Sequence, residues 1–340
     1  MQQRIVGEKK EGGRFVISLD FEINWGVRDQ QTLDQYGPNL LGVRQAIPAM
    51  LELFQEFDLR VTWATVGLLF FSNKEEMLTH LPYVQPQYSN STLSPYLALN
   101  NVGDDEAVDP YHFGYSLIAQ IRDTPGQEIA THTFCHYYCL ERGQTAESFR
   151  ADLEAAVQIA NEQNITLRSL VFPRNQYNAQ YLAICADLGI TSYRGNENSW
   201  IYKERNEEQQ SLYKRGARLL DAYFNLSGFN CYTLQEIAQQ FPYNIPASRF
   251  LRPWSGRLQS LERLRLRRIL SAMEYAARTN KVFHLWWHPH NFGVNIPQNM
   301  AVLRRIAEHY KYLKATYGME SQSMGDLAAE LHHHVPAIAS

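Results

Sequence analysis

The sequence predicts a parallel α/β fold, and three observations lead to this prediction. Short apolar runs rich in β-branched and aromatic residues alternate with segments of helical periodicity, a pattern typical of strands joined by crossover helices. No internal repeat or low-complexity linker interrupts the alternation. Polar clusters follow directly after several of the apolar runs, where the carboxyl ends of parallel strands would form a ligand site.

The composition excludes several classes of protein. The chain has 340 residues, is 45% hydrophobic and 20% charged, and carries a formal net charge of -3, which is typical of a globular protein. Near-neutral charge argues against nucleic acid as the main partner. The N-terminus is polar, no apolar run is long enough to span a bilayer, and four cysteines do not make a disulfide framework, so we expect a cytoplasmic protein.

The first elements follow from this alternation. Phe15–Asp20 is an apolar run that ends in a charge, which predicts a buried first strand, and Arg44–Phe57 has the periodicity of the helix after it. Val61–Val66 predicts a second strand, which Gly67 ends. The long polar region at about 73–110 interrupts the rhythm, and we expect it to form loops and short helices over one end of the core.

The middle of the chain continues the same pattern. Glu128–Thr131 predicts a third strand, and Ser148–Gln163 predicts a helix because its apolar residues recur at helical spacing. Ser169–Phe172 predicts a fourth strand that stops at a proline. A helix over Ala179–Leu188, with a glycine after it as a C-cap, leads into a short strand at Ile190–Tyr193.

The C-terminal part supplies one more strand and the last helices. Ser260–Thr279 predicts a long helix, Val282–Trp287 predicts the strand after it, and two further helices are expected at about 297–308 and 323–331. The helix within 260–279 is basic and amphipathic. Its arginines are most simply a solvated face, with peripheral contact to an anionic membrane as the alternative.

Two carboxylates close the first strand, in the sequence SLDFEINWG. Asp20 and Glu22 point to the same side of an extended chain, so they can face one site together. A polar strand end at the surface is the simpler alternative. Because Asp20 lies between apolar residues, however, it should be buried, and a buried carboxylate needs a partner, a proton or a metal ion.

The sequence THTFCHYYC contains two histidines and two cysteines. On a helix, His132 and His136 would share one face at i, i+4 spacing and could hold one metal ion. The stripe also includes Cys135 and Cys139, but a straight helix rises by about 10 Å over seven residues and cannot wrap all four side chains around one ion. We therefore expect the cysteines in the core, and a carboxylate from elsewhere to complete the site.

Two further clusters follow strands. In FPRNQY, Arg174 could hold a carboxylate through its planar fork with Asn175 in support, although an arginine on a surface loop is equally ordinary. In FHLWWHPHNFG, His288 and His290 follow the last long strand, where a histidine beside acids suits proton transfer. His284 lies deeper in that strand, and we expect it to be structural.

Taken in order, these segments resemble the polysaccharide deacetylase family, the NodB homology domain of carbohydrate esterases. The resemblance runs from about Phe15 to Gly293 and implies a distorted (β/α) barrel with fewer than eight repeats. It further implies a single catalytic domain over 1–340, with a core at about 14–295, the inserted loops at about 73–110 and C-terminal helices at 296–334. Members of this family remove acyl groups from sugars with a divalent metal ion, usually zinc.

The resemblance also implies roles for individual residues. SLDFE stands at the family's acidic motif, which makes Asp20 the general base and Glu22 a metal ligand, with the reverse assignment open. THTFCH matches the family's two-histidine motif, so His132 and His136 are ligands. Arg174 would be the partner of Asp20, and LWWH makes His288 the general acid. The expected substrate contacts are Tyr177, Arg194, Trp200, Trp287 and His290.

The combination of DFEINWG, FPRNQ and WWHPHNFG is similar to a subgroup associated with surface-polysaccharide biosynthesis. We therefore expect a hydrolase that removes an acetyl or other acyl group from an N-acylated sugar of a polysaccharide or its precursor, which could be lipid-linked. The alternatives are a deformylase or cyclic-amide hydrolase that uses the same site, and a metal-free sugar-binding protein with this fold.

Overall fold

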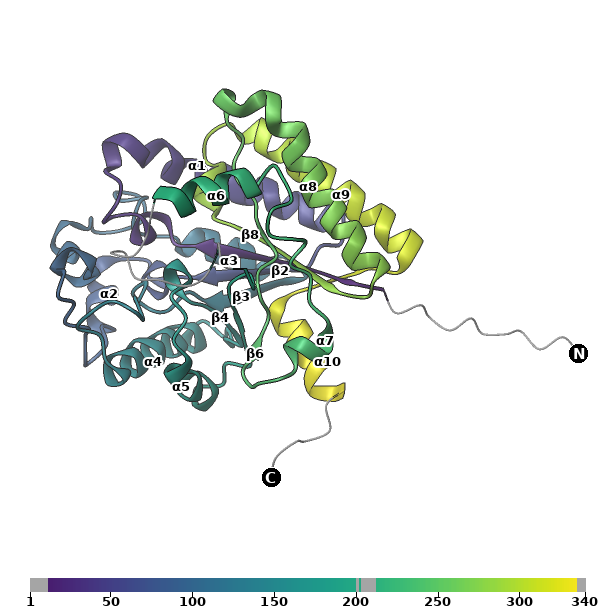
Figure 1. Cartoon of the computed structure of the whole chain (residues 1–340). Helices are drawn as coiled ribbons and strands as arrows, with labels where there is room; N and C mark the ends of the chain where they lie inside the picture. Colours follow the sequence, from purple (N-terminus) through teal and green to yellow (C-terminus); the bar gives the residue numbers. More distant parts are fainter. Residues whose placement is uncertain (1–11, 200–201, 203–211, 335–340) are drawn as a thin grey trace, which may run out of the picture.

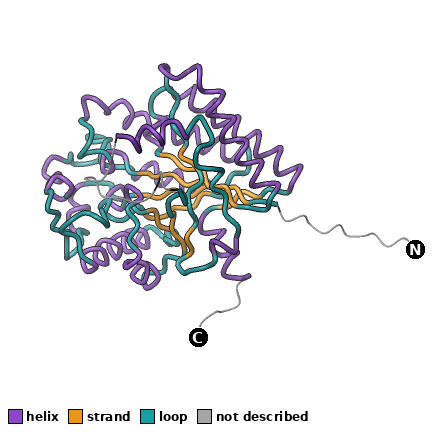
Figure 2. The backbone as a smooth tube through the Cα atoms, viewed as in Figure 1, coloured by secondary structure: helices purple, strands orange, loops and turns teal. Residues whose placement is uncertain are grey.

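A curved, wholly parallel sheet lies at the centre of the protein (Figures 1 and 2). The structure is a computed structural model that describes residues 12–199, 202 and 212–334. Within these residues the sheet has nine strands, in the order β6-β5-β4-β3-β2-β1-β8-β7, and β9 pairs with β1 beside the main path. The strands are β1 Arg14–Phe21, β2 Val61–Thr65, β3 Gln127–Thr131, β4 Ser169–Val171, β5 Ser192–Arg194, β6 Tyr243–Asn244, β7 Arg249–Phe250, β8 Val282–Trp287 and β9 Glu320–Gln322.

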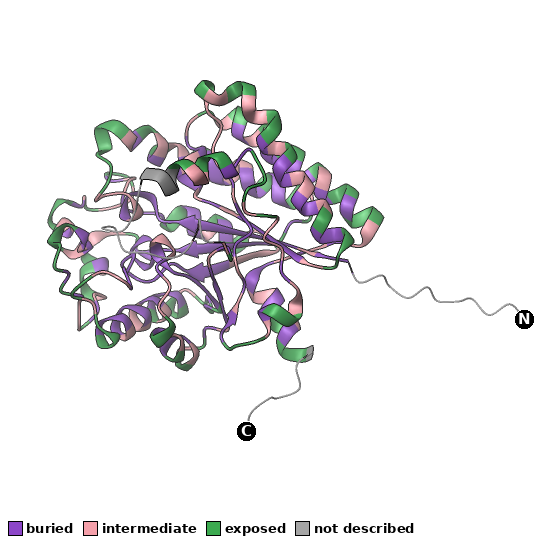
Figure 3. Ribbon diagram, in the orientation of Figure 1, coloured by how far each residue is buried: buried purple, intermediate pink, exposed green. Residues whose placement is uncertain are grey.

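Helices surround the sheet and turn their exposed sides to solvent, while the strands are almost entirely buried (Figure 3). The described α-helices are α1 Leu33–Glu56, α2 Lys74–Thr79, α3 Tyr115–Asp123, α4 Ala146–Glu162, α5 Leu182–Asp187, α6 Leu212–Asp221, α7 Leu234–Ile237, α8 Glu262–Arg278, α9 Ile296–Tyr317 and α10 Met324–His334. None of the helices in the described part of the chain combines the length and the apolar character needed to cross a bilayer.

The six predicted strands are confirmed, and the parallel α/β class with them. Sequence reasoning missed three strands, β6, β7 and β9, which have only two or three residues each and are too short to show a period. It also placed the start of the first helix too late. α1 begins at Leu33 and continues through Pro38 and Pro48, two residues that normally mark a helix boundary.

The sheet is a barrel that does not close through strand pairing in the described chain. β6 and β7 are neighbours in sequence, but they lie at opposite ends of the strand order. The short connection between them crosses the gap: Ser248 N donates to the carbonyl of His284 at 2.8 Å, and His284 Nδ1 lies 3.1 Å from the carbonyl of Ile245. This is the distorted barrel with fewer than eight repeats that the family resemblance implies.

β1 holds the central position in the sheet, between β2 and β8. Its register pairs Asp20 with Ala64 on β2 and Leu19 with Trp287 on β8, so the carboxyl ends of the three strands meet at one edge. Below that edge, Phe54 packs against both Trp63 and Trp287 at ring-centroid distances of 6.2 and 6.4 Å. Burial of large side chains of this kind stabilises a fold by about 1.5–3 kcal/mol each, so these rings stabilise the part of the barrel beneath the site.

The region between β2 and α3 is an inserted segment, which we define as residues 73–114. It contains α2 and 3-10 turns at Ser91–Leu93 and Pro95–Asn101, as the sequence predicts for 73–110. Arg44 of α1 ties down its end by donating to the carbonyls of Pro110 and Phe113 at 3.0 and 2.9 Å. The segment therefore packs against the barrel where β1 ends.

Candidate active site

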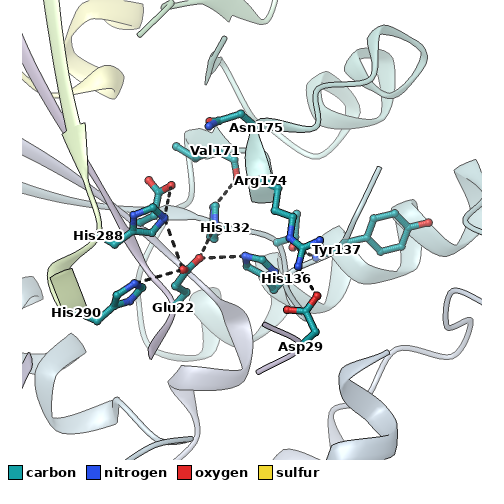
Figure 4. A network of polar contacts seen from close by, with 12 residues as sticks. Glu22, Asp29, His132, His136, Tyr137, Val171, Arg174, Asn175, His288 and His290 are labelled. Carbon is teal, nitrogen blue, oxygen red and sulfur yellow. Dashed lines mark hydrogen bonds and ion pairs between the residues drawn. The ribbon is translucent and has the colours of Figure 1, made fainter. Parts of the chain in front are cut away.

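Glu22, His132 and His136 converge on one point beyond the ends of β1 and β3 (Figure 4). Glu22 Oε2 lies 3.2 Å from His132 Nε2 and 3.0 Å from His136 Nε2. One ligand atom from each residue lies within 4.8 Å of the other two, and all three side chains are buried. The ligand atoms of a tetrahedral zinc site with bonds of about 2.0–2.1 Å would be about 3.3 Å apart, so the triad needs little movement to hold an ion.

The hydrogen bonds of the two imidazoles also fit a metal centre. His132 Nδ1 lies 2.8 Å from the carbonyl of Val171, which can only accept, so Nδ1 carries the proton and Nε2 keeps its lone pair for a ligand. His136 Nδ1 has no partner among the described residues. Burial, the main cause, lowers the pKa of His136 to about 4, and a neutral imidazole is the form that binds metal.

The histidine segment is not the helix that the i, i+4 spacing suggested. Residues 132–138 are irregular, and Thr133 and His136 have φ angles of 63° and 60°, in the left-handed region that non-glycine residues seldom adopt. These two positive φ angles turn the backbone so that the histidines meet, without a helical face. The prediction for the cysteines is confirmed, because Cys135 and Cys139 are fully buried in the core.

Asp152 of α4 holds this irregular segment from below. Its carboxylate accepts the backbone N–H groups of Phe134 and Cys135 at 2.8 and 3.1 Å. Sequence reasoning missed it, although a signal existed, since Asp152 shares a helical stripe with the buried Ala156 and Ala160. Burial, which outweighs these hydrogen bonds, raises the pKa of Asp152 to about 6.

This shift predicts a pH dependence of stability. The folded pKa lies above the unfolded value of about 3.9, so the stabilisation from protonated Asp152 is complete below about pH 4 and declines as the pH rises through 6. We expect the free energy of unfolding of the wild type, relative to Asp152→Asn, to be about 1 kcal/mol lower at pH 7 than at pH 5. Denaturant titrations with chelator present would measure this difference. A difference independent of pH would contradict the assignment.

The carboxylate of Glu22 is the centre of the polar network. Burial acts to raise its pKa, but the charge of His288 and the hydrogen bonds of His132 and His136 outweigh burial and hold the pKa well below its ordinary value. Glu22 is therefore an anion. Its side chain lies directly over Gly26, where an added Cβ would stand 2.0 Å from Glu22 Cδ.

We expect Gly26→Ala to displace the Glu22 carboxylate, because no heavy atom can approach another at that distance. The metal affinity should weaken by about 10- to 100-fold, the range found when the support of a ligand is lost. Titration with zinc against a chromogenic chelator would measure it. Gly37→Ala is a matched control, since its added Cβ would meet its nearest neighbour, Tyr111 Oη, at 3.4 Å. An unchanged affinity in Gly26→Ala would show that Glu22 is not a ligand.

Asp20 pairs with Arg194 of β5. The two form a bidentate ion pair at 2.6 and 2.7 Å, and Arg194 also donates to Asn175 Oδ1 at 2.9 Å. Burial acts to raise the pKa of Asp20, but Arg194, His132 and His288 together lower it. The guanidinium carbon of Arg194 lies 4.1 Å from the centre of the Trp286 ring, and this cation–π contact helps to hold the arginine in place.

This arrangement corrects two sequence predictions. Arg174 was expected to pair with Asp20, and Arg194 to contact substrate. Instead Arg194 is 1% exposed and holds Asp20, while Arg174 forms an ion pair with the buried Asp29 and lies 4.5 Å above the ring of Tyr138. The reason is that Arg174 adopts a φ of 53° just after β4, which directs its side chain toward the histidine segment (Figure 4).

His288 lies between the two acids. Its Nε2 atom is 3.7 Å from Asp20 Oδ2 and 3.6 Å from Glu22 Oε1, and its side chain is 24% exposed, whereas those of the two acids are 4% exposed. His288 is thus the group in this cluster that an incoming molecule can reach. His290 Nε2 is 4.0 Å from Glu22 Oε1 and buried, and burial lowers its pKa to about 3.

The remaining predicted residues are spread around the site. Trp287 is fully buried against Phe54 and Phe292, so the prediction that it contacts substrate is wrong; the half-buried Trp286 points toward the site instead. Tyr177 stacks on the ring of Tyr193 at 5.2 Å, and Trp200 lies outside the described residues. His284 is structural as expected, bonded to Ser18 Oγ at 2.9 Å.

Comparison with known proteins supports the fold. No protein-family profile matches the chain, and no curated protein matches it. Among solved structures, one from Mycobacterium smegmatis described as a polysaccharide deacetylase is 14% identical, with a TM-score of 0.59 over 98% of this chain and 95% of that one. One from Pseudomonas aeruginosa PAO1 described in the same way is 12% identical, with a TM-score of 0.54 over 95% and 92%.

A third similar structure is that of the allantoinase PuuE, which is 12% identical with a TM-score of 0.55 over 95% of this chain and 91% of that one. At these identities the likeness is one of fold. The resemblance stated from the motifs is confirmed at that level, because the chain has the fold of structures described as polysaccharide deacetylases over nearly their whole length.

Proposed function

We propose that this protein is a metal-dependent hydrolase of the polysaccharide deacetylase family that removes an acyl group from an N-acylated sugar. The observation that carries the proposal is the arrangement around Glu22. One of its oxygens faces two imidazoles suited to a metal ion, and the other faces His288, which also lies beside Asp20. Residues that could bind a metal ion, accept a proton and donate a proton thus lie close enough together to act on one amide bond of a substrate.

Glu22, His132 and His136 would hold a divalent ion, most simply zinc, because one carboxylate and two imidazoles are a common three-ligand set of catalytic zinc. When bound, the ion would polarise the acyl carbonyl and lower the pKa of water. Glu22 rather than Asp20 fills the ligand role here, since both oxygens of Asp20 are engaged by Arg194.

The other residues move protons. Asp20 is ionised and oriented by Arg194, so it accepts the proton of the attacking water. His288 is partly exposed and donates a proton to the departing nitrogen. Without this proton the nitrogen would have to leave as an amide anion, which is a poor leaving group. Arg194 is buried and donates to Ser18, Asp20 and Asn175, so it acts as a positioning residue for Asp20.

The proposed substrate is an N-acylated sugar of a polysaccharide or its precursor. A sugar ring could lie against Trp286, beside His288, since aromatic faces bind the apolar faces of sugars. A lipid-linked precursor in the cytoplasm, with peripheral membrane contact at most, remains a prediction from the sequence. A single catalytic domain is part of the proposal.

A second candidate is a cyclic-amide hydrolase, favoured by the similar fold of an allantoinase. Ring opening needs the same attack on an amide carbonyl but releases no separate acid. A deformylase differs only in the acyl group released.

The test is an acyl-release screen on the zinc-loaded protein, with metal content measured in parallel. We expect near one metal ion per chain and release of acetate or formate from N-acylated amino sugars, lost on chelation and restored by metal. Ring opening of allantoin without acyl release would favour the second candidate. Protein that binds sugar but retains no metal after loading would favour a metal-free binding protein and overturn the proposal.

A further inference from the structure

A buried chain of hydrogen bonds connects the inserted segment to the turn that carries Glu22. Asp109 Oδ2 lies 2.7 Å from His112 Nδ1, and His112 Nε2 lies 2.8 Å from Asn24 Nδ2. All three residues are at least 92% buried, with exposed fractions of 8%, 8% and 7%. Buried polar groups that are satisfied in series hold one another in fixed geometry.

The carboxylate of Asp109 determines which group donates and which accepts in each hydrogen bond of this chain. Asp109 also accepts the backbone N–H groups of Gly103 and Tyr111 at 2.9 and 3.2 Å, and with His112 these bonds outweigh burial and lower its pKa. The ionised carboxylate accepts from Nδ1–H of His112. The Asn24 amide donates to Nε2 of the ring, so His112 fixes the orientation of Asn24.

The turn that receives these bonds is under backbone strain. Ile23, next to the ligand Glu22, has a φ of 45°, and a β-branched residue in this region is a genuine outlier that its surroundings must maintain. The inserted segment supplies further bonds to the same turn. The carbonyl of Tyr111 accepts Asn24 N–H at 3.2 Å, and the carbonyl of His112 accepts Trp25 Nε1–H at 2.9 Å.

The barrel holds the other side of this assembly. Arg44 of α1 binds the carbonyls of Pro110 and Phe113, on either side of His112. On the side of the turn, the ring of Trp25 meets that of His112 edge to face at 4.9 Å. His112 thus lies between a fixed wall and a strained turn. The Glu22 carboxylate, which rests over Gly26 in that turn, inherits the position of the turn.

We propose that His112 is a positioning residue for Glu22, and that the inserted segment serves as a brace which keeps the strained turn 22–26 in its metal-binding geometry. The proposal rests on the proposed function in that Glu22 is a metal ligand. The inserted segment, which contains none of the catalytic motifs, thus supports the site from outside, through Asn24.

The experiment compares His112→Ala, His112→Gln and the control His80→Ala. His80 belongs to the same segment but faces Glu162 at 3.1 Å, away from the turn. Zinc affinity is measured by competition with a chelator, and crystal structures of each metal-free protein locate the Glu22 carboxylate. We expect His112→Ala to bind zinc about 10- to 100-fold more weakly, and Glu22 to leave its position beside His132 and His136.

His112→Gln keeps an acceptor for Asn24 and should recover most of the affinity, whereas His80→Ala should match the wild type. A general loss of stability would not produce rescue by glutamine. An unmoved Glu22 carboxylate in metal-free His112→Ala would overturn the inference, even if the wild type bound no zinc. Absence of zinc binding by the wild type with Glu22 displaced in His112→Ala would support the brace and reject the proposed function, so the two failures are distinguishable.

Discussion

Replacing His132 or His136 with alanine is expected to remove the bound metal ion and to lower kcat/KM for acyl release by at least about 10³-fold, because a metal ion supplies several kcal/mol of transition-state stabilisation. Both imidazoles face the same oxygen of Glu22, so either substitution leaves only two of the three proposed ligands. Elemental analysis after dialysis and initial-rate kinetics would measure the two losses together.

The control is His80→Ala, which removes a histidine that lies outside the site and should retain both metal and activity. Thermal unfolding in the presence of chelator separates a missing ligand from a misfolded protein. Stoichiometric zinc in the His132→Ala/His136→Ala double variant would reject the metal site.

Substitution of Arg194 should have the second-largest effect. Arg194→Gln removes the charge that offsets Asp20 in a buried setting, so Asp20 would tend to bind a proton and could not serve as base. We expect kcat to fall by about 10²- to 10⁴-fold, the range for loss of general base catalysis, while KM changes little. Arg194→Lys keeps the charge without the planar fork, and its kcat should lie between those of the wild type and Arg194→Gln.

Arg174→Gln is the matched comparison, because it removes an arginine of the same region that pairs with Asp29 rather than Asp20. Steady-state kinetics and zinc titration of the three variants would distinguish the two arginines. A larger loss of kcat in Arg174→Gln than in Arg194→Gln would support Arg174 as the partner of Asp20, as expected from the sequence. It would contradict the pairing of Asp20 with Arg194.

The strands and the residues proposed to hold a metal ion were predictable because each has a local signal. Apolar runs ending in Asp20, Thr131 and Trp287 mark strands whose carboxyl ends must meet in a parallel sheet, and this alone brings Glu22, His132 and His288 together. The depth of Trp287 was harder to foresee, since adjacent strand residues face opposite sides and the pattern does not say which side holds the core.

The partners of the charged residues could not be read from the chain. Whether Arg174 or Arg194 reaches Asp20 depends on backbone angles in the turn after β4, where Arg174 has a positive φ that no sequence pattern announces. The helix once expected for His132 and His136 failed for the same reason. Asp152 contacts backbone N–H groups and His112 contacts the Asn24 amide; neither belongs to a catalytic motif, and a place on a buried helical stripe was the signal for Asp152.

The position of β1 has a consequence for how the protein is made. β1 is synthesised before every other described strand of the sheet, but one of its two edges pairs with β8, which follows only after β7. A nascent chain that has reached β5 contains Glu22, His132, His136 and Arg194, yet it lacks both His288 and β8. Closing such a long loop makes folding slow, and assembly of the candidate site must wait until β8 and the residues that follow it have been synthesised.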